Sequence, residues 1–195
     1  NVIDESNLND IMLTVGDPDE AVAYFKKTSA EQPERIDLKR GLAKSLIRAN
    51  HPTEAVAVWT QIVASPEGTA DDRVALADSL IRTNEWSRAE AELNKIPPTH
   101  ETYERYRLEA MVADSKKDWK KADSFYEIAA GLTTKPSGVL NNWGFSKLTR
   151  GDYAAIALAA SACTIASCTW PRPMPPQSLG MCGIQRPAFM ASLRI

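Results

Sequence analysis

The chain has 195 residues and a mass of 21.4 kDa, enough for one domain with a sizeable core or for a stack of small units. Its formal charge of -2 and isoelectric point near 5.8 argue against a polyanionic partner, so we expect no nucleic-acid binding. No apolar run reaches the roughly 20 residues of a membrane-spanning helix, and residues 1–10 lack the residue order of a signal peptide.

The composition changes sharply after Asp152. Residues 1–152 hold all 25 acidic residues and 20 of the 23 basic ones, a formal charge of -5. Residues 153–195 hold no Asp, Glu or Lys, and they contain all three cysteines of the chain. Because no cysteine precedes Cys163, the regular part of the chain is neither a disulfide framework nor a zinc module.

One pattern recurs in four segments along the chain. In each segment a small residue is followed, four positions later, by a large apolar or aromatic one. Successive small residues are 34, 34 and 33 positions apart. A fixed period of this length predicts an array of structural repeats. The four pairs are Ala21 with Phe25, Ala55 with Trp59, Ala89 with Leu93, and Ala122 with Tyr126.

Each repeat is expected to hold two antiparallel helices. A second helical signature precedes the small and large pair, as in Leu42-Ala43 and Leu76-Ala77, which are also 34 residues apart. Pro18 and Pro52 suit the first turn of a second helix. Between the two helices lie residue types that mostly accept the left-handed backbone conformation of a helix C-cap: Gly16, Asn50, Asn84, Lys117 and Gly151.

This periodicity predicts an all-α solenoid over residues 5–153, with about four and a half units. Pro33, the pair Pro97-Pro98 and Pro136 mark the ends of units. The expected units lie near residues 2–35, 36–69, 70–102, 103–136 and 137–153.

The pattern resembles the tetratricopeptide repeat (TPR). Ala21, Phe25 and Pro33 match the family spacing, and the fifth unit begins "NNWGFSKLTRGDY", close to the usual family opening. The departures are Glu67 at the place of the final proline, the 33-residue spacing of the fourth unit, and Asn9 where Gly or Ala is usual. The resemblance implies a right-handed α-solenoid of antiparallel helix pairs, and a protein-interaction scaffold without catalysis.

In the family, the first helices of the units line a concave groove that binds a protein or peptide. Carrying these positions over gives a basic wall that suits an acidic or C-terminal peptide. The alternative is that basic residues at every fourth position form a solvated helix face. The candidate partner-binding residues are Arg40, Lys44, Arg48, Asp78, Arg82, Arg107, Met111, Asn141, Asn142 and Phe145, with Val74, Ile81 and Asp114 beside them.

A carboxylate clamp of Lys, Asn and Arg, found in some TPR domains, is matched only in part. Arg40, Lys44 and Asn142 are similar in kind, but Ala75 stands where an Asn is needed. No catalytic site, metal site or cofactor is predicted, because no glycine-rich phosphate loop and no complete set of metal-ligand spacings occurs. We interpret His51 and His100 as turn residues.

A narrower resemblance covers the segment from Arg35 to Tyr153. It is similar to the TPR lipoproteins of bacterial tight-adherence (Flp pilus) assembly, which sit at the outer membrane and help assemble the pilus secretin. This implies a periplasmic, outer-membrane-associated scaffold with a pilus or secretin component as partner. The lipid-bearing cysteine of those lipoproteins has no counterpart in the first 162 residues. A cytoplasmic location is the alternative.

Two other function classes stay open. One is a structural solenoid that associates with itself, with a homodimer formed through its C-terminal end. The other is an enzyme that uses the cysteines of the tail.

The repeat pattern stops after Tyr153. The next unit position calls for Ala at 156 and a large residue at 160, but the chain has Ile156 and Ala160. One hypothesis is a shift of reading frame near codon 154, and the alternative is a C-terminal extension that caps the solenoid. Residues 154–166 favour an alanine-rich helix, and the prolines from Pro171 onward would interrupt it.

Overall fold

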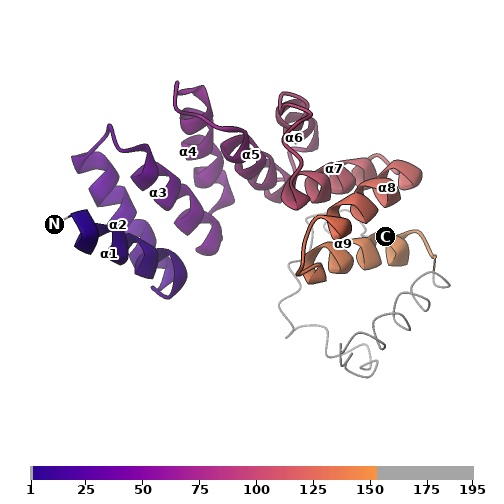
Figure 1. Cartoon of the computed structure of the whole chain (residues 1–195), viewed down its shortest axis with the longest axis horizontal. Coiled ribbons are helices and arrows are strands. Elements are labelled where there is room, and N and C mark those ends of the chain that lie inside the picture. The colour runs from indigo at the N-terminus through magenta and orange to yellow at the C-terminus, as the bar shows by residue number, and fades with distance from the viewer. Residues whose placement is uncertain (1, 153–195) are drawn as a thin grey trace, which may run out of the picture.

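A computed structural model describes residues 2–152, with side chains described from Leu8 onward. Every regular element in this range is an α-helix (Figure 1), which confirms the all-α prediction. The expectations for residues 154–195 lie outside the described residues. The helices are α1 (Val2–Thr14), α2 (Pro18–Glu31), α3 (Ile36–Arg48), α4 (Pro52–Ala64), α5 (Ala70–Arg82), α6 (Trp86–Leu93), α7 (Tyr103–Ser115), α8 (Trp119–Gly131) and α9 (Ser137–Thr149).

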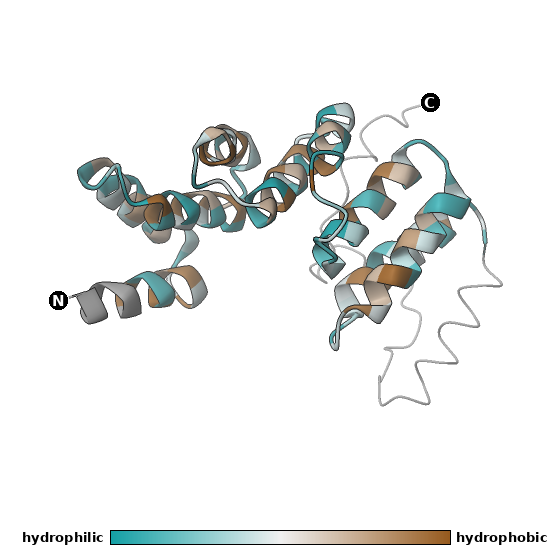
Figure 2. Cartoon of the chain, turned by 45° about the horizontal axis from the view of Figure 1, so that its top comes forward, coloured by the Kyte–Doolittle hydropathy of each residue, from teal (hydrophilic) through white to brown (hydrophobic). Residues whose placement is uncertain are grey.

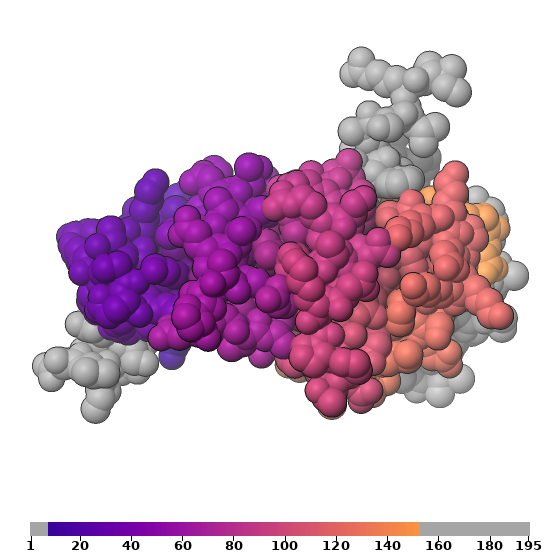
Figure 3. All heavy atoms as spheres, turned by 90° about the horizontal axis from the view of Figure 1, so that it is seen from above, coloured from indigo at the N-terminus to yellow at the C-terminus, as the bar shows by residue number. Residues whose placement is uncertain are grey.

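The helices follow one another in chain order along an elongated molecule (Figures 1 and 3), and each helix packs on the next. The small residues of the repeat lie where helix axes approach: Ala21, Ala55, Ala89 and Ala122 are all 0% exposed. The large residues four positions later fill the space between hairpins, because Phe25, Trp59, Leu93 and Tyr126 are only 1–2% exposed. In Figure 2 the described helices each carry hydrophobic and hydrophilic residues, as expected when one face is packed.

Four of the hairpin turns have the same geometry. Asn50, Asn84, Lys117 and Gly151 have φ values between 61° and 80°, in the left-handed region. In the first of these turns His51 N–H donates to the carbonyl of Leu46 at 2.8 Å, and the other three turns repeat this bond. These are Schellman caps, which satisfy the last helical carbonyls and reverse the chain. Gly16 is not in the left-handed region, so the first turn differs from the sequence-based expectation.

Gly41 of α3 allows α2 and α3 to approach each other closely. A Cβ atom at this position would lie 2.5 Å from the Phe25 ring of α2. Phe25 is 1% exposed, so its ring has little room to move. The ring can occupy this space only because residue 41 has no side chain.

The core divides into two clusters that meet at α7. Leu108 and Val112 of α7 belong to the cluster built by α3 to α6, whereas Ala110 and Ala113 belong to a second cluster with α8 and α9. At the junction, α6 has 8 residues where α2 to α5 have 13 or 14. Pro97 and Pro98 follow closely and disfavour a longer helix. Figure 1 shows α7 to α9 turned relative to α3 and α4.

Trp59, Trp86 and Trp143 pack in or against the two core clusters. Trp59 is buried, and Trp86 and Trp119 begin α6 and α8. Trp143 stacks on Tyr126 with a ring-centroid distance of 6.2 Å, and its Nε1–H donates to Asp123 at 2.6 Å. These contacts join α9 to α8.

We predict opposite stability changes from two glycine substitutions. Gly41→Ala should lower the free energy of unfolding by about 1–3 kcal/mol, because the new methyl group overlaps the Phe25 ring. Gly144→Ala, in the middle of α9, meets no atom within 4 Å and should raise it by about 0.5–1 kcal/mol through the better helix propensity of alanine. Urea unfolding measures both. Equal effects of the two substitutions would contradict the close approach at Gly41.

Candidate functional site

Side-chain bonds join the first helices of successive hairpins, namely α1, α3, α5, α7 and α9, which we call the first-helix row. Arg40 of α3 bonds both carboxylate oxygens of Asp72 on α5, through Nε at 2.8 Å and a terminal nitrogen at 2.7 Å. It also donates to the carbonyl of Glu67 at 3.0 Å. Arg40, a predicted groove residue, therefore forms a bidentate ion pair that links two repeats.

Asp72 also completes the capping box at the start of α5, where Thr69 is the N-cap residue. Its carboxylate accepts from the backbone N–H and the hydroxyl of Thr69, and the Thr69 hydroxyl accepts from the Asp72 backbone N–H. Burial alone raises the pKa of Asp72, but the bonds from Arg40 and Thr69 outweigh it and lower that pKa below its usual value. The repeat pattern did not identify Asp72 as the partner of Arg40.

Arg48 ties α3 to the end of α1. Its guanidinium donates to the carbonyls of Met12 and Gly16 at 2.9 and 2.8 Å. These carbonyls lie in the last turn of α1 and just after it, where no helical N–H can reach them. Both acceptors are neutral, so the positive charge of Arg48 persists.

Asp78 of α5 lies between two arginines of the row. One carboxylate oxygen accepts from Arg82 Nε at 2.7 Å, and the other accepts from Arg107 of α7 at 3.1 Å. Arg107 Nη1 and Asn142 Nδ2 of α9 also lie 3.8 and 3.3 Å from the sulfur of Met111. The structure thus brings five of the predicted residues together across α5, α7 and α9.

Asp114 lies in a buried cluster instead of on an open wall. Its two oxygens accept from Ser146 of α9 at 2.7 Å and from Tyr126 of α8 at 2.9 Å. Burial raises the pKa of Asp114 in spite of these two bonds. Burial and the adjacent Asp114 carboxylate also raise the pKa of Tyr126. This cluster fastens three helices to one another.

The remaining candidates differ in exposure. Val74 and Ile81 are only 7% and 5% exposed, so the expectation that they line a groove is wrong: they point into the core. Lys44 is exposed and has no ion-pair partner among the side chains of residues 8–152. Asn141 is exposed and Phe145 is half-buried.

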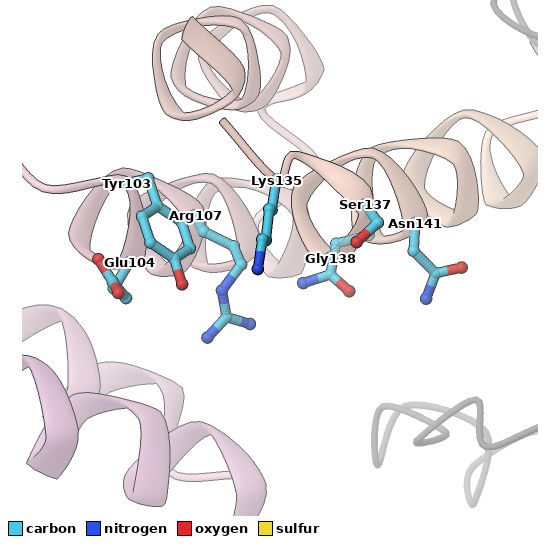
Figure 4. A pocket seen from close by; sticks show the side chains of 8 residues that line it. Tyr103, Glu104, Arg107, Lys135, Ser137, Gly138 and Asn141 are labelled. Atoms are coloured by element: carbon cyan, nitrogen blue, oxygen red, sulfur yellow. The ribbon is translucent and has the colours of Figure 1, made fainter. Parts of the chain in front are cut away.

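A pocket of about 420 Å³ opens between the first turns of α7 and α9. Figure 4 shows the Lys135 side chain between the two helices, with its amino group on the same side as the Arg107 guanidinium. Arg107, Asn141 and Asn142 were predicted site residues. The pocket is lined by Tyr103, Glu104 and Arg107 of α7, Lys135 of the loop before α9, and Ser137, Gly138, Asn141 and Asn142 of α9.

Sequence reasoning missed Lys135 because it lies in a loop between units, outside the helical positions that the repeat assigns to a groove. The loop is held by a bond from the Lys135 backbone N–H to the Thr133 hydroxyl, at 3.1 Å. Glu104 is the acidic lining residue. A hydrogen bond to Glu104, together with partial burial, raises the pKa of Tyr103.

A second, smaller pocket of about 230 Å³ lies where α6 ends early, between α6, α7 and α8. Four of its six charged lining residues form two ion pairs: Lys116 lies 2.6 Å from Glu90, and Arg105 lies 2.8 Å from Glu109. These pairs leave the second pocket less suited to a charged ligand than the first.

No group of three or more His, Cys, Asp or Glu side chains within residues 8–152 is arranged to hold a metal ion. None of the helices in this range combines the length and the apolar character that crossing a membrane requires. His51 precedes α4 and His100 lies in the turn before α7, as the sequence indicated.

We predict that Asp72 and Asp114 affect stability with opposite pH dependence. The lowered pKa of Asp72 means that its pairing stabilises the fold above the unfolded-state pKa of about 3.9, and that this contribution is lost as the pH falls through the lowered value. The raised pKa of Asp114 means that stability falls as the pH rises from about 3.9 through the raised value.

Urea unfolding of Asp72→Asn and Asp114→Asn against the native chain, between about pH 3 and pH 7, tests this. The deficit of Asp72→Asn should shrink toward low pH. Relative to the native chain, Asp114→Asn should become more stable as the pH rises. Curves that run parallel to the native one at every pH would contradict the assignment.

Comparison with known proteins supports the repeat. Residues 12–71 match the family model of the tetratricopeptide repeat. No curated protein matches the chain. Among solved structures the chain is similar to MamA, residue 41 to the end, from Desulfovibrio magneticus RS-1, with a TM-score of 0.66 and 16% identity over 82% of this chain and 91% of that chain. Residues 12–71 thus match the tetratricopeptide repeat, and the described chain has the fold of a TPR-type α-solenoid.

Proposed function

We propose that the chain is a non-catalytic scaffold that binds an acidic segment of a partner protein along the first-helix row. The observation that carries this proposal is a group of four cations on α3, α5 and α7 whose charge carboxylates do not fully neutralise. The five helices of the row together have a formal charge of -1, from nine basic and ten acidic residues, so the positive charge is local to this group. A local field of this kind attracts and orients an acidic partner.

Each cation of this group is at most partly neutralised. Lys44 is exposed and has no ion-pair partner in the described part of the chain. Arg48 bonds neutral carbonyls only, and Arg82 and Arg107 share the single charge of Asp78. Arg40 differs, because Asp72 balances it. We therefore assign partner binding to Lys44, Arg48, Arg82 and Arg107, and a structural role to Arg40.

The TPR match and the solenoid fold support a protein-binding role, because solenoids present extended surfaces that recognise protein partners. The resemblance to tight-adherence lipoproteins supports a finer proposal, a scaffold in assembly of the bacterial envelope. In that proposal the partner is a pilus or secretin component and the compartment is the periplasm at the outer membrane.

Selection of a displayed random peptide library on the immobilised full chain tests the binding role. We expect the selected peptides to be enriched in Asp and Glu. Lys44→Glu should weaken their binding about three- to tenfold, because it reverses an exposed charge that faces the partner. Lys120→Glu is the matched control, since it makes the same charge change at an exposed position of α8, outside the row.

Fluorescence anisotropy with one selected peptide measures both variants. Equal losses from Lys44→Glu and Lys120→Glu would show a general charge effect and contradict binding along the row. Selected peptides without acidic enrichment would contradict the proposed partner chemistry.

A second candidate function is self-association through the C-terminal end. Large apolar side chains are exposed at the C-terminal end of the described residues, with Leu140 and Leu148 of α9 at 42% and 50%, Ile128 of α8 at 42%, and Leu132, just after α8, at 44%. Exposed apolar side chains on a terminal repeat favour contact with another protein surface.

Light scattering of the full chain over a concentration series tests this candidate. Self-association should give a dimer mass at high concentration, and Leu148→Asp should return it to the monomer mass by placing a charge in the contact. A monomer at all concentrations would leave partner binding as the function.

A further inference from the structure

We infer that the pocket between α7 and α9 is an anchoring site for one carboxylate group of the partner, held by Arg107 and Lys135. This inference rests on the proposed partner-binding function and assigns one chemical group to one place on the row. The pocket lies where α7 and α9 begin, and its lining draws on both helices and on the loop before α9.

Arg107 has donors to spare. Its bond to the Asp78 carboxylate uses one terminal nitrogen at 3.1 Å, and a second nitrogen has only the Met111 sulfur at 3.8 Å. Arg40, in contrast, uses two nitrogens on both oxygens of Asp72. Asp78 thus orients the Arg107 guanidinium without occupying the planar fork that suits a carboxylate.

Lys135 supplies a second cation. Its side chain is exposed and makes no ion pair with any described residue. Figure 4 shows its amino group near the same opening as the Arg107 guanidinium, with Ser137 and Asn141 on the α9 side. The loop is held at Thr133, and Pro136 follows at once, so the backbone that carries this lysine is constrained. A ligand in the pocket would meet a pre-positioned charge.

The lining favours a single negative charge. Arg107 and Lys135 contribute two positive charges and Glu104 contributes one negative charge. Glu104 would repel a doubly charged phosphate more strongly than a carboxylate. Ser137, Asn141 and Asn142 add neutral donors. The group can come from a C-terminus or from an Asp or Glu side chain, because both offer the same two oxygens.

Nitrogen-15 NMR titration of the full chain with four short alanine-glycine peptides tests the site. The first has a free C-terminal carboxylate, the second a C-terminal amide and one central Glu, the third an amide and no charge, and the fourth an amide and one phosphoserine. We expect saturable changes in the backbone amide chemical shifts of Gly138 and Asn141 with the first peptide, the second peptide or both. The neutral peptide should cause none. Shifts with the first alone would identify the C-terminus as the source, and shifts with the second alone would identify a side chain.

Lys135→Met should weaken binding of the carboxylate peptides at least about fivefold, as expected for loss of a charge-assisted hydrogen bond. Arg107→Lys keeps the charge but loses the fork, and should weaken them as well. Lys120→Met, on α8 and outside the pocket, should change nothing. Lys135 is exposed, so its substitution should leave the spectrum of the folded chain intact.

Two results would overturn the site: carboxylate binding that is the same in Lys135→Met and the native chain, or saturation by the phosphoserine peptide alone. The selected acidic peptide separates this inference from the proposed function. If Lys44→Glu weakens binding of that peptide while Lys135→Met does not, only the pocket assignment fails. If neither variant weakens it, the proposed function fails too.

Discussion

The close approach of neighbouring helices at a few small residues is the constraint on which this solenoid depends. A hairpin of two short helices cannot bury an apolar face alone, so each one must stack on the next. Ala21, Ala55, Ala89 and Ala122 are fully buried and let the axes come close. Gly41 acts in the same way, because the Phe25 ring occupies the space that a side chain at residue 41 would need.

Stacking at this period has a second consequence, for the charged residues. It sets the first helices beside one another, so side chains about 30 residues apart in sequence can form bonds. Some pairs are complete, as in Arg40 with Asp72, and these join repeats. Other pairs leave one positive charge unneutralised, because Arg82 and Arg107 share the single carboxylate of Asp78. The same row therefore holds the repeats together and carries the cations that we propose bind a partner.

The core changes in composition at α7. The α3 to α6 part is built around one apolar cluster, and α7 to α9 around a smaller one, supplemented by the buried Asp114 bonds to Tyr126 and Ser146. Alanines supply much of the smaller cluster. Polar bonds and the stacked ring of Trp143 thus have a larger share in holding α9 in place. The pocket at the start of α9 depends on this attachment.

Most of the fold could be predicted from the sequence, because the information is local and periodic. The small and large residues, the left-handed turn positions and the prolines each follow from the geometry of a single hairpin. Asn50, Asn84, Lys117 and Gly151 took the expected conformation. Gly16 did not.

The candidate site could be predicted only in part. The repeat positions identified Arg107, Asn141 and Asn142, which line the pocket, but also Val74 and Ile81, which are core residues. By itself, the sequence determined the helix pairs, their period and the row on which the cations lie. The tertiary structure alone decided which cations are neutralised and that Lys135 joins Arg107 at one pocket. The physical reason is that an ion pair depends on distances across helices, which the rotation between repeats sets and no local pattern encodes.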